Sequence, residues 1–531
     1  MPVYIAARRR MTGVLVANLL TLGVAPVMAA SDGLEVIRNV CSRCHLPTGE
    51  AQWSRISEQR KTPEGWLMTI VRMQTIHGVE LSADDRKAVH RYLSDRYGLA
   101  PAESEGYRYA LERRLNTIET PPSTGYAEMC ARCHSGARPL LQRRTKNEWN
   151  RLIDFHVGQW ASIEYSQYGR DRDWLGMARN DIVPMLASKY PYDHEAWRAW
   201  LAVKPASETL AGAWHFSAHM PGEGDVRGVM RVSVSADDGF KVTLEGVRAD
   251  GRAFSGSGSA LLYSGHEWRG SVRIDGVRMR QVFSVQDGLM KGRMFETEHD
   301  ERGLDFLASQ VSETASPRLL AVQPSHVKAG TEADLHLVGV GLSGQPDVGP
   351  GVEIVSVAPV KPSGAMRVKV RVAADAEPGE RRVRIGKAEG ASLAVYRRID
   401  AVKVMPDYAV ARIGGNGGSM PKVQGRFDAE AWGTDVHGKA FRIGVVPARW
   451  SVEPFNEDAS VNRDVEFAGR IDEASGIFTP GDAGPNPARR MSANNVGNLK
   501  VQATVEDAGR TVRGEGQLIV TVPRWNNPPV P

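Results

Sequence analysis

The pattern Cys-x-x-Cys-His occurs twice in this chain, at Cys41–His45 and Cys130–His134. The two copies use all 4 cysteines of the 531-residue sequence. This spacing is typical of c-type haem attachment, in which both thiols bond to the porphyrin and the adjacent histidine reaches the iron. The sequence therefore predicts two covalently held haem groups. The residues of the first attachment site are Cys41, Cys44 and His45, and those of the second are Cys130, Cys133 and His134.

Other uses of paired cysteines fit this spacing less well. A zinc site could draw four sulfur ligands from the two pairs, but it would not need a histidine directly after each pair. A thioredoxin-like redox pair lies at a strand-to-helix turn in a βαβ pattern, and no such pattern surrounds these motifs. Structural disulfides usually join segments that are far apart in the sequence. Haem attachment is therefore the interpretation that explains both motifs.

Residues 1–30 have the three parts of a secretory signal peptide. Positions 8–10 are all arginine, positions 11–27 are apolar and uncharged, and positions 28–30 supply residues for cleavage. An uncleaved membrane anchor is the alternative, but the Gly and Pro within the apolar run favour cleavage. No later run is long and apolar enough to span a membrane. Because covalent haem attachment in bacteria takes place outside the inner membrane, signal and motif together predict a periplasmic protein.

Composition limits the partners of the chain more than its fold. Apolar residues make up 42% and charged residues 24%, values that are ordinary for globular domains and favour several packed cores. The formal net charge is only +5, so nothing suggests a nucleic-acid partner. Because every cysteine belongs to a haem motif, hydrophobic cores alone must hold the other domains.

The N-terminal part of the mature chain is predicted to be helical, with two cytochrome c-like units at 31–120 and 121–205. Thr62 precedes a proline in the way that an N-cap precedes the first helical position. Thr145 has capping-box spacing to Glu148. An apolar stripe of helical period follows each of these starts, so one helix is expected after each motif.

A tryptophan in each unit precedes a candidate for the sixth ligand of the iron. Trp66 lies seven residues before Met73, and Trp149 lies seven residues before His156. A haem iron that only carries electrons is usually six-coordinate, with His and Met or with two His. We therefore predict Met73 on the first iron and His156 on the second.

Alternatives remain open for both positions. His77 would share a helical face with Met73, and Met177 and Met185 follow His156 in the second unit. A methionine on an apolar stripe is also a common core residue. If the preferred ligands hold, the two haems differ in potential, because thioether ligation raises the potential relative to two imidazoles.

After about residue 205 the pattern changes to short alternating strands separated by Asp-Gly dipeptides, as in antiparallel hairpins. Residues 206–316 are predicted to form a small antiparallel barrel. Residues 317–400 and 401–531 have strands at sandwich spacing, so two immunoglobulin-like domains are expected. The fold class is thus a multidomain chain, with an α-helical tandem cytochrome domain followed by three all-β domains.

The motif pair, the β-rich tail and the overall length together resemble the α subunit of bacterial quinohemoprotein amine dehydrogenase. The resemblance spans essentially the whole mature chain. The CxxCH motifs alone are shared by all c-type cytochromes, so the combination carries the specificity. Residue by residue, the resemblance assigns one haem to Cys41, Cys44 and His45 and the other to Cys130, Cys133 and His134.

In that family the α subunit joins a β-propeller subunit and a small γ subunit that carries a cysteine tryptophylquinone cofactor. Primary amines are oxidised to aldehydes at the quinone, and electrons leave singly through the haems to a small copper protein or a cytochrome c. The resemblance therefore implies an electron-transfer role within a heterotrimeric oxidoreductase. Because haem takes every cysteine of this chain, none remains for a quinone crosslink, and no catalytic residue of amine oxidation is expected here.

Two other functions compete with this interpretation. The chain could be a dihaem cytochrome that serves another periplasmic dehydrogenase, with its β domains as docking modules. It could instead be a dihaem peroxidase, which needs one iron with an open sixth position. The Met and His candidates in both units disfavour the peroxidase, and the spin state of the haems would distinguish it.

Overall fold

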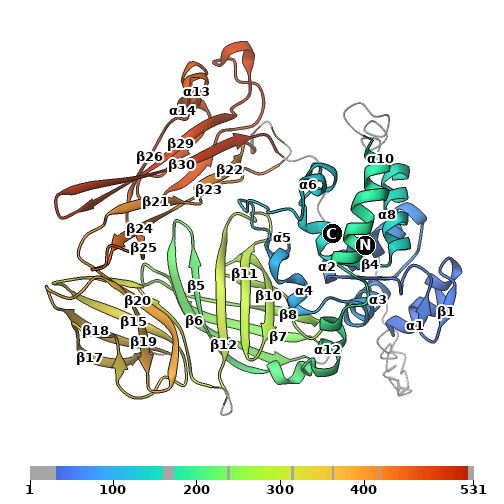
Figure 1. The fold of residues 1–531 in the computed structure, drawn as a ribbon, viewed down its shortest axis with the longest axis horizontal. Coiled ribbons are helices and arrows are strands. Elements are labelled where there is room, and N and C mark those ends of the chain that lie inside the picture. Colours follow the sequence, from blue (N-terminus) through green and yellow to red (C-terminus); the bar gives the residue numbers. More distant parts are fainter. Residues whose placement is uncertain are drawn as a thin grey trace, which may run out of the picture.

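The computed structural model describes residues 32–159, 173–235, 239–312, 316–360, 364–416, 418 and 420–523. The predicted signal peptide, residues 1–30, lies outside the described residues. A helical region comes first in the chain and lies beside a closed barrel, and two further β domains pack on the far side of that barrel (Figure 1). The predicted order, helices first and then all-β domains, is confirmed.

The helical region is built from short helices that surround two small ribbons. Its α-helices are α1 (Gly33–Asn39), α2 (Pro63–His77), α3 (Ala83–Arg96), α4 (Pro101–Ser104), α5 (Arg108–Leu111), α6 (Thr124–Cys130), α7 (Ala137–Leu140), α8 (Lys146–Gln159), α10 (Trp174–Met177), α11 (Val183–Lys189) and α12 (Glu195–Val203). Single 3₁₀ turns cover Cys41–Arg43, Glu105–Tyr107 and Ser207–Leu210, and a π turn covers Ala178–Ile182. The short strands are β1 (Pro47–Gly49), β2 (Gln52–Trp53), β3 (Gln59–Lys61) and β4 (Gln142–Arg144).

The two helices predicted from Thr62 and Thr145 begin where these signals place them. The Thr62 hydroxyl accepts the backbone N–H of Gly65 at the start of α2, and Gly78 ends that helix with a φ of 66°. The Thr145 hydroxyl accepts the N–H of Glu148 at 3.2 Å at the start of α8. The Glu148 carboxylate turns instead toward arginines, so only half of the capping box forms.

Strands β3 and β4 pair with each other and join the two halves of the helical region. Arg60 lies opposite Arg143, and Lys61 lies opposite Gln142. Each strand has the sequence Gln-Arg followed by a basic residue and Thr, and each leads into a tryptophan-bearing helix. Since Arg60 and Arg143 are equivalent residues of the repeat and face each other, the ribbon itself has an approximate two-fold axis through this pair.

Residues 212–310 form a closed eight-stranded antiparallel barrel, as predicted. Its strands are β5 (Gly212–Met220), β6 (Gly224–Val234), β7 (Phe240–Val247), β8 (Ala253–Tyr263), β9 (Glu267–Ile274), β10 (Val277–Gln286), β11 (Leu289–Glu296) and β12 (Gly303–Gln310). Asp275 and Gly276 both have positive φ, which is the conformation that a two-residue hairpin turn needs. Aromatic side chains such as Phe283 and Phe306, stacked at 4.5 Å between centroids, fill the interior.

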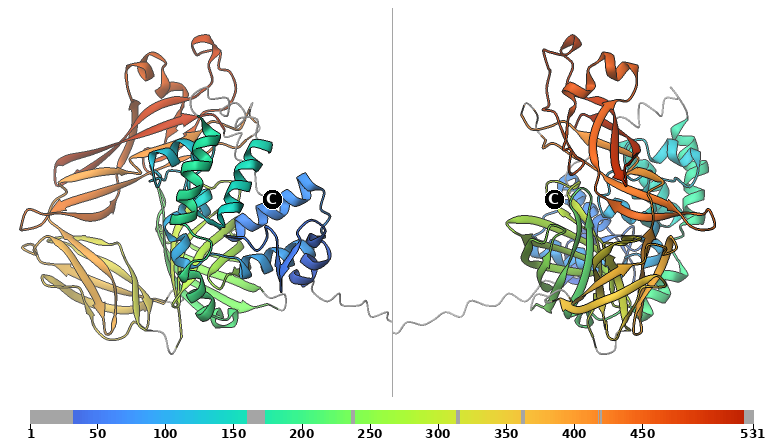
Figure 2. Two further views of the ribbon diagram at one scale, coloured as in Figure 1. Left: turned by 45° about the vertical axis from the view of Figure 1, so that its right-hand side comes forward. Right: turned by 90° about the vertical axis from the view of Figure 1, so that its left-hand side faces the viewer.

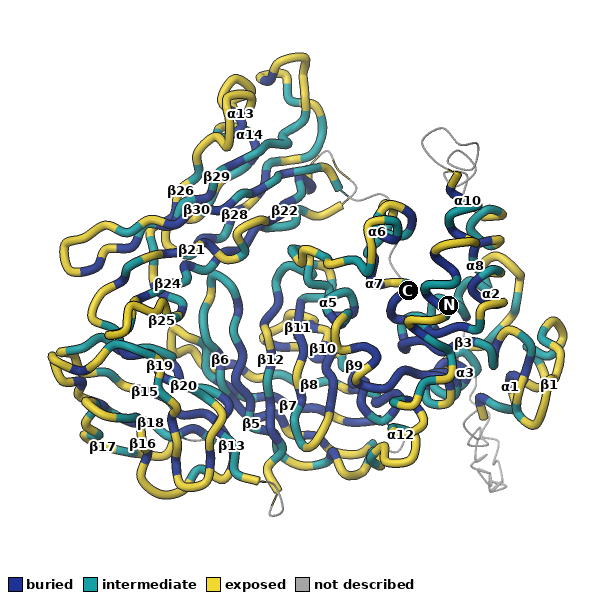
Figure 3. Tube along the Cα trace, viewed as in Figure 1, coloured by how far each residue is buried: buried dark blue, intermediate teal, exposed yellow. Residues whose placement is uncertain are grey.

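Each of the two later β domains has its own hydrophobic core, visible as buried stretches of strand (Figure 3). The third domain contains β13 (Arg318–Gln323), β14 (His326–Lys328), β15 (Glu332–Val340), β16 (Pro346–Asp347), β17 (Val352–Val360), β18 (Ala365–Val372), β19 (Gly379–Ile385) and β20 (Ala388–Tyr396). The fourth contains β21 (Ala401–Met405), β22 (Tyr408–Arg412), β23 (Gly425–Arg426), β24 (Asp428–Thr434), β25 (Ala440–Val446), β26 (Arg449–Pro454), α13 (Glu457–Val461), α14 (Asp464–Phe467), β27 (Gly469–Ile471), β28 (Ile477–Pro480), β29 (Gly497–Asp507) and β30 (Arg510–Thr521). Their assignment as immunoglobulin-like sandwiches stays a prediction.

The barrel lies between the helical region and the two later β domains (Figure 2), and hydrogen bonds join it to each of them. Arg269 of β9 donates to Glu64 of α2, and the buried Glu267 accepts from Arg108 of α5 at 2.8 Å. On the opposite side, His219 of β5 bonds to Asp428 of β24 at 2.9 Å. The helical region and the last domain are therefore both bonded to the barrel. Among the described helices, none combines the length and the apolar character that a membrane span requires.

Candidate functional site

The first motif forms a tight turn directly after α1. The backbone N–H groups of Cys44 and His45 both donate to the carbonyl of Cys41, at 3.1 and 3.0 Å. The Nδ1 of His45 lies 3.0 Å from the carbonyl oxygen of Ser54. With the proton on Nδ1 donated to that oxygen, the lone pair of Nε2 is available to a metal. This is the arrangement that an axial haem ligand needs.

The second motif begins at the last residue of α6, Cys130, and continues into a loop. The Nδ1 of His134 lies 2.9 Å from the carbonyl oxygen of Ser135, which again leaves Nε2 for a metal. Burial lowers the pKa of His45 and of His134, so both imidazoles are neutral near pH 7. Neutral imidazole is the form that binds iron.

All four cysteines lie in the described residues, and none of them forms a disulfide. Burial, with a smaller effect of Cys44, raises the pKa of the Cys41 thiol to about 11. Burial raises the pKa of Cys130 to about 12. Cys44 and Cys133 are exposed, so each motif has one thiol against the core and one toward solvent. Two thiols and one neutral imidazole per motif fit the donor set of covalently attached haem.

The predicted sixth ligand of the second site lies on α8. The Nδ1 of His156 is 2.7 Å from the carbonyl oxygen of Leu152, and its ring lies 6.4 Å from that of Trp174. Repulsion from His156 is one of the causes that lower the pKa of His134, after burial. The structure therefore brings the two imidazoles near each other, and the role of His156 as a ligand stays a prediction.

Both candidates for the sixth ligand of the first iron lie on α2. Met73 is half-buried on α2, and His77 is the exposed last residue of that helix. Repulsion from His77 is a minor cause of the lowered pKa of His45, so these two rings lie within electrostatic reach. In the second unit, Met177 and Met185 pack against a cluster of buried residues that includes Trp174.

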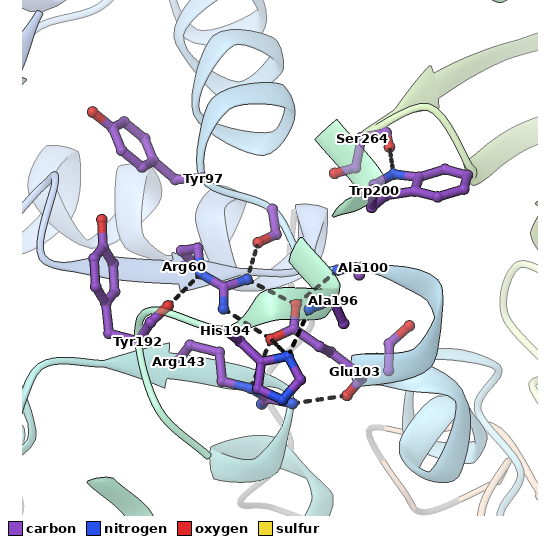
Figure 4. A network of polar contacts seen from close by, with 12 residues as sticks. Arg60, Tyr97, Ala100, Glu103, Arg143, Tyr192, His194, Ala196, Trp200 and Ser264 are labelled. Atoms are coloured by element: carbon purple, nitrogen blue, oxygen red, sulfur yellow. Dashed lines mark hydrogen bonds and ion pairs between the residues drawn. The ribbon is translucent and has the colours of Figure 1, made fainter. Parts of the chain in front are cut away.

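A buried carboxylate holds the two units together, and the sequence analysis missed it. Glu103 accepts two bonds from Arg60, both at 2.8 Å, and one from Arg143 at 3.1 Å (Figure 4). Arg60 also donates to the carbonyl oxygen of Tyr192 at 2.8 Å. Two-pronged arginine–carboxylate pairs of this kind fix geometry as well as charge. The repeated Gln-Arg pair before each tryptophan helix was the available signal.

Four family models match successive parts of this chain. Their descriptions are the haem-binding region of the quinohemoprotein amine dehydrogenase α subunit (residues 31–197), its domain II (207–311), its domain III (316–397) and its domain IV (402–530). The chain belongs to the quinohemoprotein amine dehydrogenase α-subunit family. The resemblance predicted from the sequence is thereby confirmed, and with it haem binding by the helical region of an oxidoreductase subunit.

Solved structures resemble parts of this α subunit only weakly. A de novo designed fluorescence-activating β-barrel is 22% identical and covers 20% of this chain and 98% of its own, with a TM-score of 0.18. Drosophila N-cadherin EC1-3 is 13% identical and covers 45% and 79%, with a TM-score of 0.19. A Bacteroides ovatus protein of a mixed-linkage glucan utilization locus, SGBP-B, is 11% identical and covers 58% and 60%, with a TM-score of 0.17. No curated protein matches the chain.

Proposed function

We propose that this chain is the dihaem electron-transfer subunit of a periplasmic amine dehydrogenase. The observation that carries the proposal is that two complete haem-attachment motifs lie in the haem-binding region of a chain that matches the α-subunit family in all four domains. Haem, when bound, supplies a reversible one-electron carrier. The cysteines of the two motifs would hold it covalently, and His45 and His134, which are neutral and oriented by backbone carbonyls, would bind the iron.

The partners follow from the family. A small subunit with cysteine tryptophylquinone would oxidise primary amines to aldehydes, and a β-propeller subunit would complete the heterotrimer. Electrons would pass from the quinone through the two haem sites of this chain to a copper protein or a cytochrome c. Because all four cysteines belong to the motifs, this chain itself carries electron transfer and no amine oxidation.

Haem content tests the first part of the proposal. The chain is exported in a bacterium that matures c-type cytochromes, and haem per chain is measured on the purified protein. We expect two covalent haems, a mature chain that begins near Ser31, and one haem in the double variants C41A/C44A and C130A/C133A. Ser42→Ala, a change inside the first motif that spares its ligands, should leave two. A cytoplasmic, unprocessed chain would contradict the proposed location.

Absorption spectra test the sixth ligands. We propose Met73 for the first iron and His156 for the second, and His77 is the alternative to Met73. Met73→Ala should remove the long-wavelength absorption band of methionine-ligated ferric haem, while His77→Ala should leave it. If the parent protein shows no such band and His77→Ala changes the spectrum of the first haem, His77 is the ligand instead. A band that survives in Met73→Ala would assign it to another methionine.

Amine-driven reduction tests the role in the complex. Adding a primary amine to the assembled complex should reduce both haems, whereas the isolated chain should stay oxidised. A high-spin haem that reacts with peroxide in the isolated chain would favour the peroxidase interpretation instead.

A further inference from the structure

A cluster of positive side chains lies between the two haem-motif units. It is contributed by β3, α2, α7, β4, α8 and the loop before β3. Its members are Arg55, Lys61, Arg72, Arg138, Arg144 and Arg151. One buried carboxylate lies among them, that of Glu148, whose side chain is 1% exposed. It forms ion pairs with Arg55 at 3.1 Å, Arg144 at 3.5 Å and Arg151 at 2.8 Å. This one carboxylate is shared among three of the cations.

The other three cations, Lys61, Arg72 and Arg138, have no carboxylate partner within the part of the chain that the structure describes. Lys61, only 3% exposed, donates to the Thr69 hydroxyl at 2.6 Å and lies 5.0 Å from the Trp66 ring. The guanidinium of Arg72 lies 4.4 Å from the centroid of Phe155. Arg138 contacts the sulfur of Met68. Stacking and sulfur contacts do not neutralise a charge, so Arg72 and Arg138 keep theirs. Burial, with smaller effects of Arg144 and Arg72, lowers the pKa of Lys61 well below its usual range, so a bound anion would favour the charged form of this lysine.

The repeat of the two ribbon strands shows which carboxylate the first unit lacks. In the second unit, Arg144 has Glu148 four residues later as its carboxylate partner. Lys61 takes the equivalent place in the first unit, and the residue four positions on is Gly65. A Cβ at Gly65 would lie 3.0 Å from the Cβ of Lys61, so the backbone there is packed directly against the lysine. The first unit therefore has the cation of the pair without the anion.

Contacts of the unpaired arginines cross between the two units. Arg72 of α2 stacks on Phe155, the neighbour of His156, while Arg138, four residues after His134, touches α2. Lys61 is buried and Arg72 is half-buried, whereas Arg138 is exposed in this structure. The unpaired Lys61 and Arg72 are costly, because desolvated charges need a partner. An anion that is part of a bound group at these sites would supply one.

We propose that Lys61, Arg72 and Arg138 form a carboxylate-binding centre that holds haem propionate groups between the two haems. The proposal rests on the dihaem function above, since each haem carries two propionates and is tethered to an adjacent motif. Arginine offers a planar fork that matches a carboxylate, and lysine adds a point charge. By neutralising the propionates, the centre favours the reduced, less positive iron. These three are positioning residues that tune potential.

The test is a redox titration of the full mature chain with haem attached, in buffer without phosphate, from pH 5 to pH 8. The variants are K61M, R72Q and R138Q. Arg72→Lys keeps the charge and should therefore restore the potential that Arg72→Gln lowers. R179Q is the matched control, because Arg179 pairs with Asp154 on the surface.

We expect two haems per chain in every variant. Arg72→Gln or Arg138→Gln should lower the equilibrium constant for reduction of at least one haem about tenfold, which is about 59 mV for a one-electron couple. The potential should also become more dependent on pH, because the pKa of an unpaired propionate rises. The propionate bending bands in resonance Raman spectra should shift in the same variants and recover in Arg72→Lys.

Unchanged potentials, pH dependence and propionate bands in Arg72→Gln and Arg138→Gln would overturn the proposal. A potential that responds to added phosphate or acetate in the parent protein would also overturn it, because the centre would then bind a free anion. The readouts need neither amine nor partner subunits. The propionate-binding centre can therefore be disproved while the proposed amine dehydrogenase function holds, and that function can be disproved while the centre holds.

Discussion

His219 lies between two carboxylates at the boundary of the barrel and the last domain. Its Nδ1 is 2.8 Å from Asp225, and its Nε2 is 2.9 Å from Asp428. Burial lowers the pKa of this imidazole, but the two hydrogen-bonded carboxylates outweigh burial and raise it to about 10. The His219 side chain is therefore protonated at neutral pH, and its ion pair with Asp428 links the barrel to the last domain.

The first prediction is that the stability contributed by the ion pairs of His219 depends on pH. Folding raises the pKa of His219. The stabilisation that its ion pairs contribute is therefore complete below pH 6.5, the pKa of histidine in the unfolded chain, and is lost as the pH rises toward 10. His219→Gln should cost about 2 kcal/mol at pH 6, a figure reduced for partial exposure of the pair, and almost nothing at pH 10. Urea unfolding at the two pH values measures this. His437→Gln, in an exposed turn, is the control, and an equal loss at both pH values would contradict the prediction.

At the scale of elements, the β3–β4 ribbon decides how the two units face each other. Its strands are only three residues long, and Arg60 and Arg143 lie buried and directly opposite each other. Two facing cations repel, so the ribbon depends on the carboxylate of Glu103 between them. The pairing of Arg60 with Arg143 in this ribbon thus depends on one buried anion from α4, while Glu148 links the two units separately through Arg55.

The second prediction follows from that dependence. Glu103→Gln keeps the shape of the side chain but leaves two buried arginines without a counter-ion, which costs about 3–5 kcal/mol. Denaturant unfolding of the protein with haem attached should show this loss. Glu105→Gln, at an exposed position close by, should change stability by less than about 0.5 kcal/mol. Equal stability of the two variants would show that the ribbon does not rely on Glu103.

Local sequence signals predicted elements and motifs but not their pairing. Thr62, Thr145 and the Asp-Gly turns act within a few residues, so the starts of α2 and α8 and the hairpins of the barrel could be read directly. The β3–β4 ribbon joins segments far apart in the chain through buried charge, which no local pattern encodes. For the same reason the spacing of Cys and His predicted the haem motifs, while the cations Lys61, Arg72 and Arg138 became visible only in the fold.

At the scale of the whole molecule, the barrel is the body to which the haem-bearing region is fixed. Glu267, 2% exposed, accepts from Arg108 at 2.8 Å and pairs with Arg269 at 2.9 Å. Arg269 in turn reaches Glu64 on α2, the helix that carries Met73 and His77. Despite burial, the charges of Arg108 and Arg269 hold the pKa of Glu267 well below its usual range. The orientation of α2 is therefore linked to the barrel through buried ion pairs.

The third prediction tests that link. Because the pKa of Glu267 is depressed on folding, its stabilisation is present above pH 4.5 and is lost as pH falls toward the folded value. Glu267→Gln should cost about 3–5 kcal/mol at pH 7, since it leaves buried arginines unpaired, and should weaken the acid dependence of stability. Limited proteolysis should then separate the helical region from the barrel. Glu245→Gln, on an exposed barrel pair with Arg231, is the control. If the stability of Glu267→Gln falls with acid as steeply as that of the unchanged protein, the prediction is wrong.

The last prediction concerns residues 317–531, which we propose grip the partner subunits. The third domain meets the barrel where His215 lies 2.7 Å from the carbonyl oxygen of Gly339, and the fourth meets it through His219. A contact with the helical region is the bond from the N–H of Val410 to Asn116, at 3.0 Å. Since the helical region has its own cores and is fixed to the barrel, a chain ending near residue 312 should keep both haems.

The same shortened chain should lose its partners. Co-expressed with the other subunits, it should give less than a tenth of the complex recovered with the full chain, measured by co-purification on a tag at the N-terminus of the mature protein. A chain that lacks only residues 524–531 is the control and should assemble normally. Two haems together with lost assembly would mean that electron carriage and subunit docking occupy separate parts of the chain. Full recovery of the complex would mean that the partners bind the helical region or the barrel, and that the two later domains are spacing rather than scaffold.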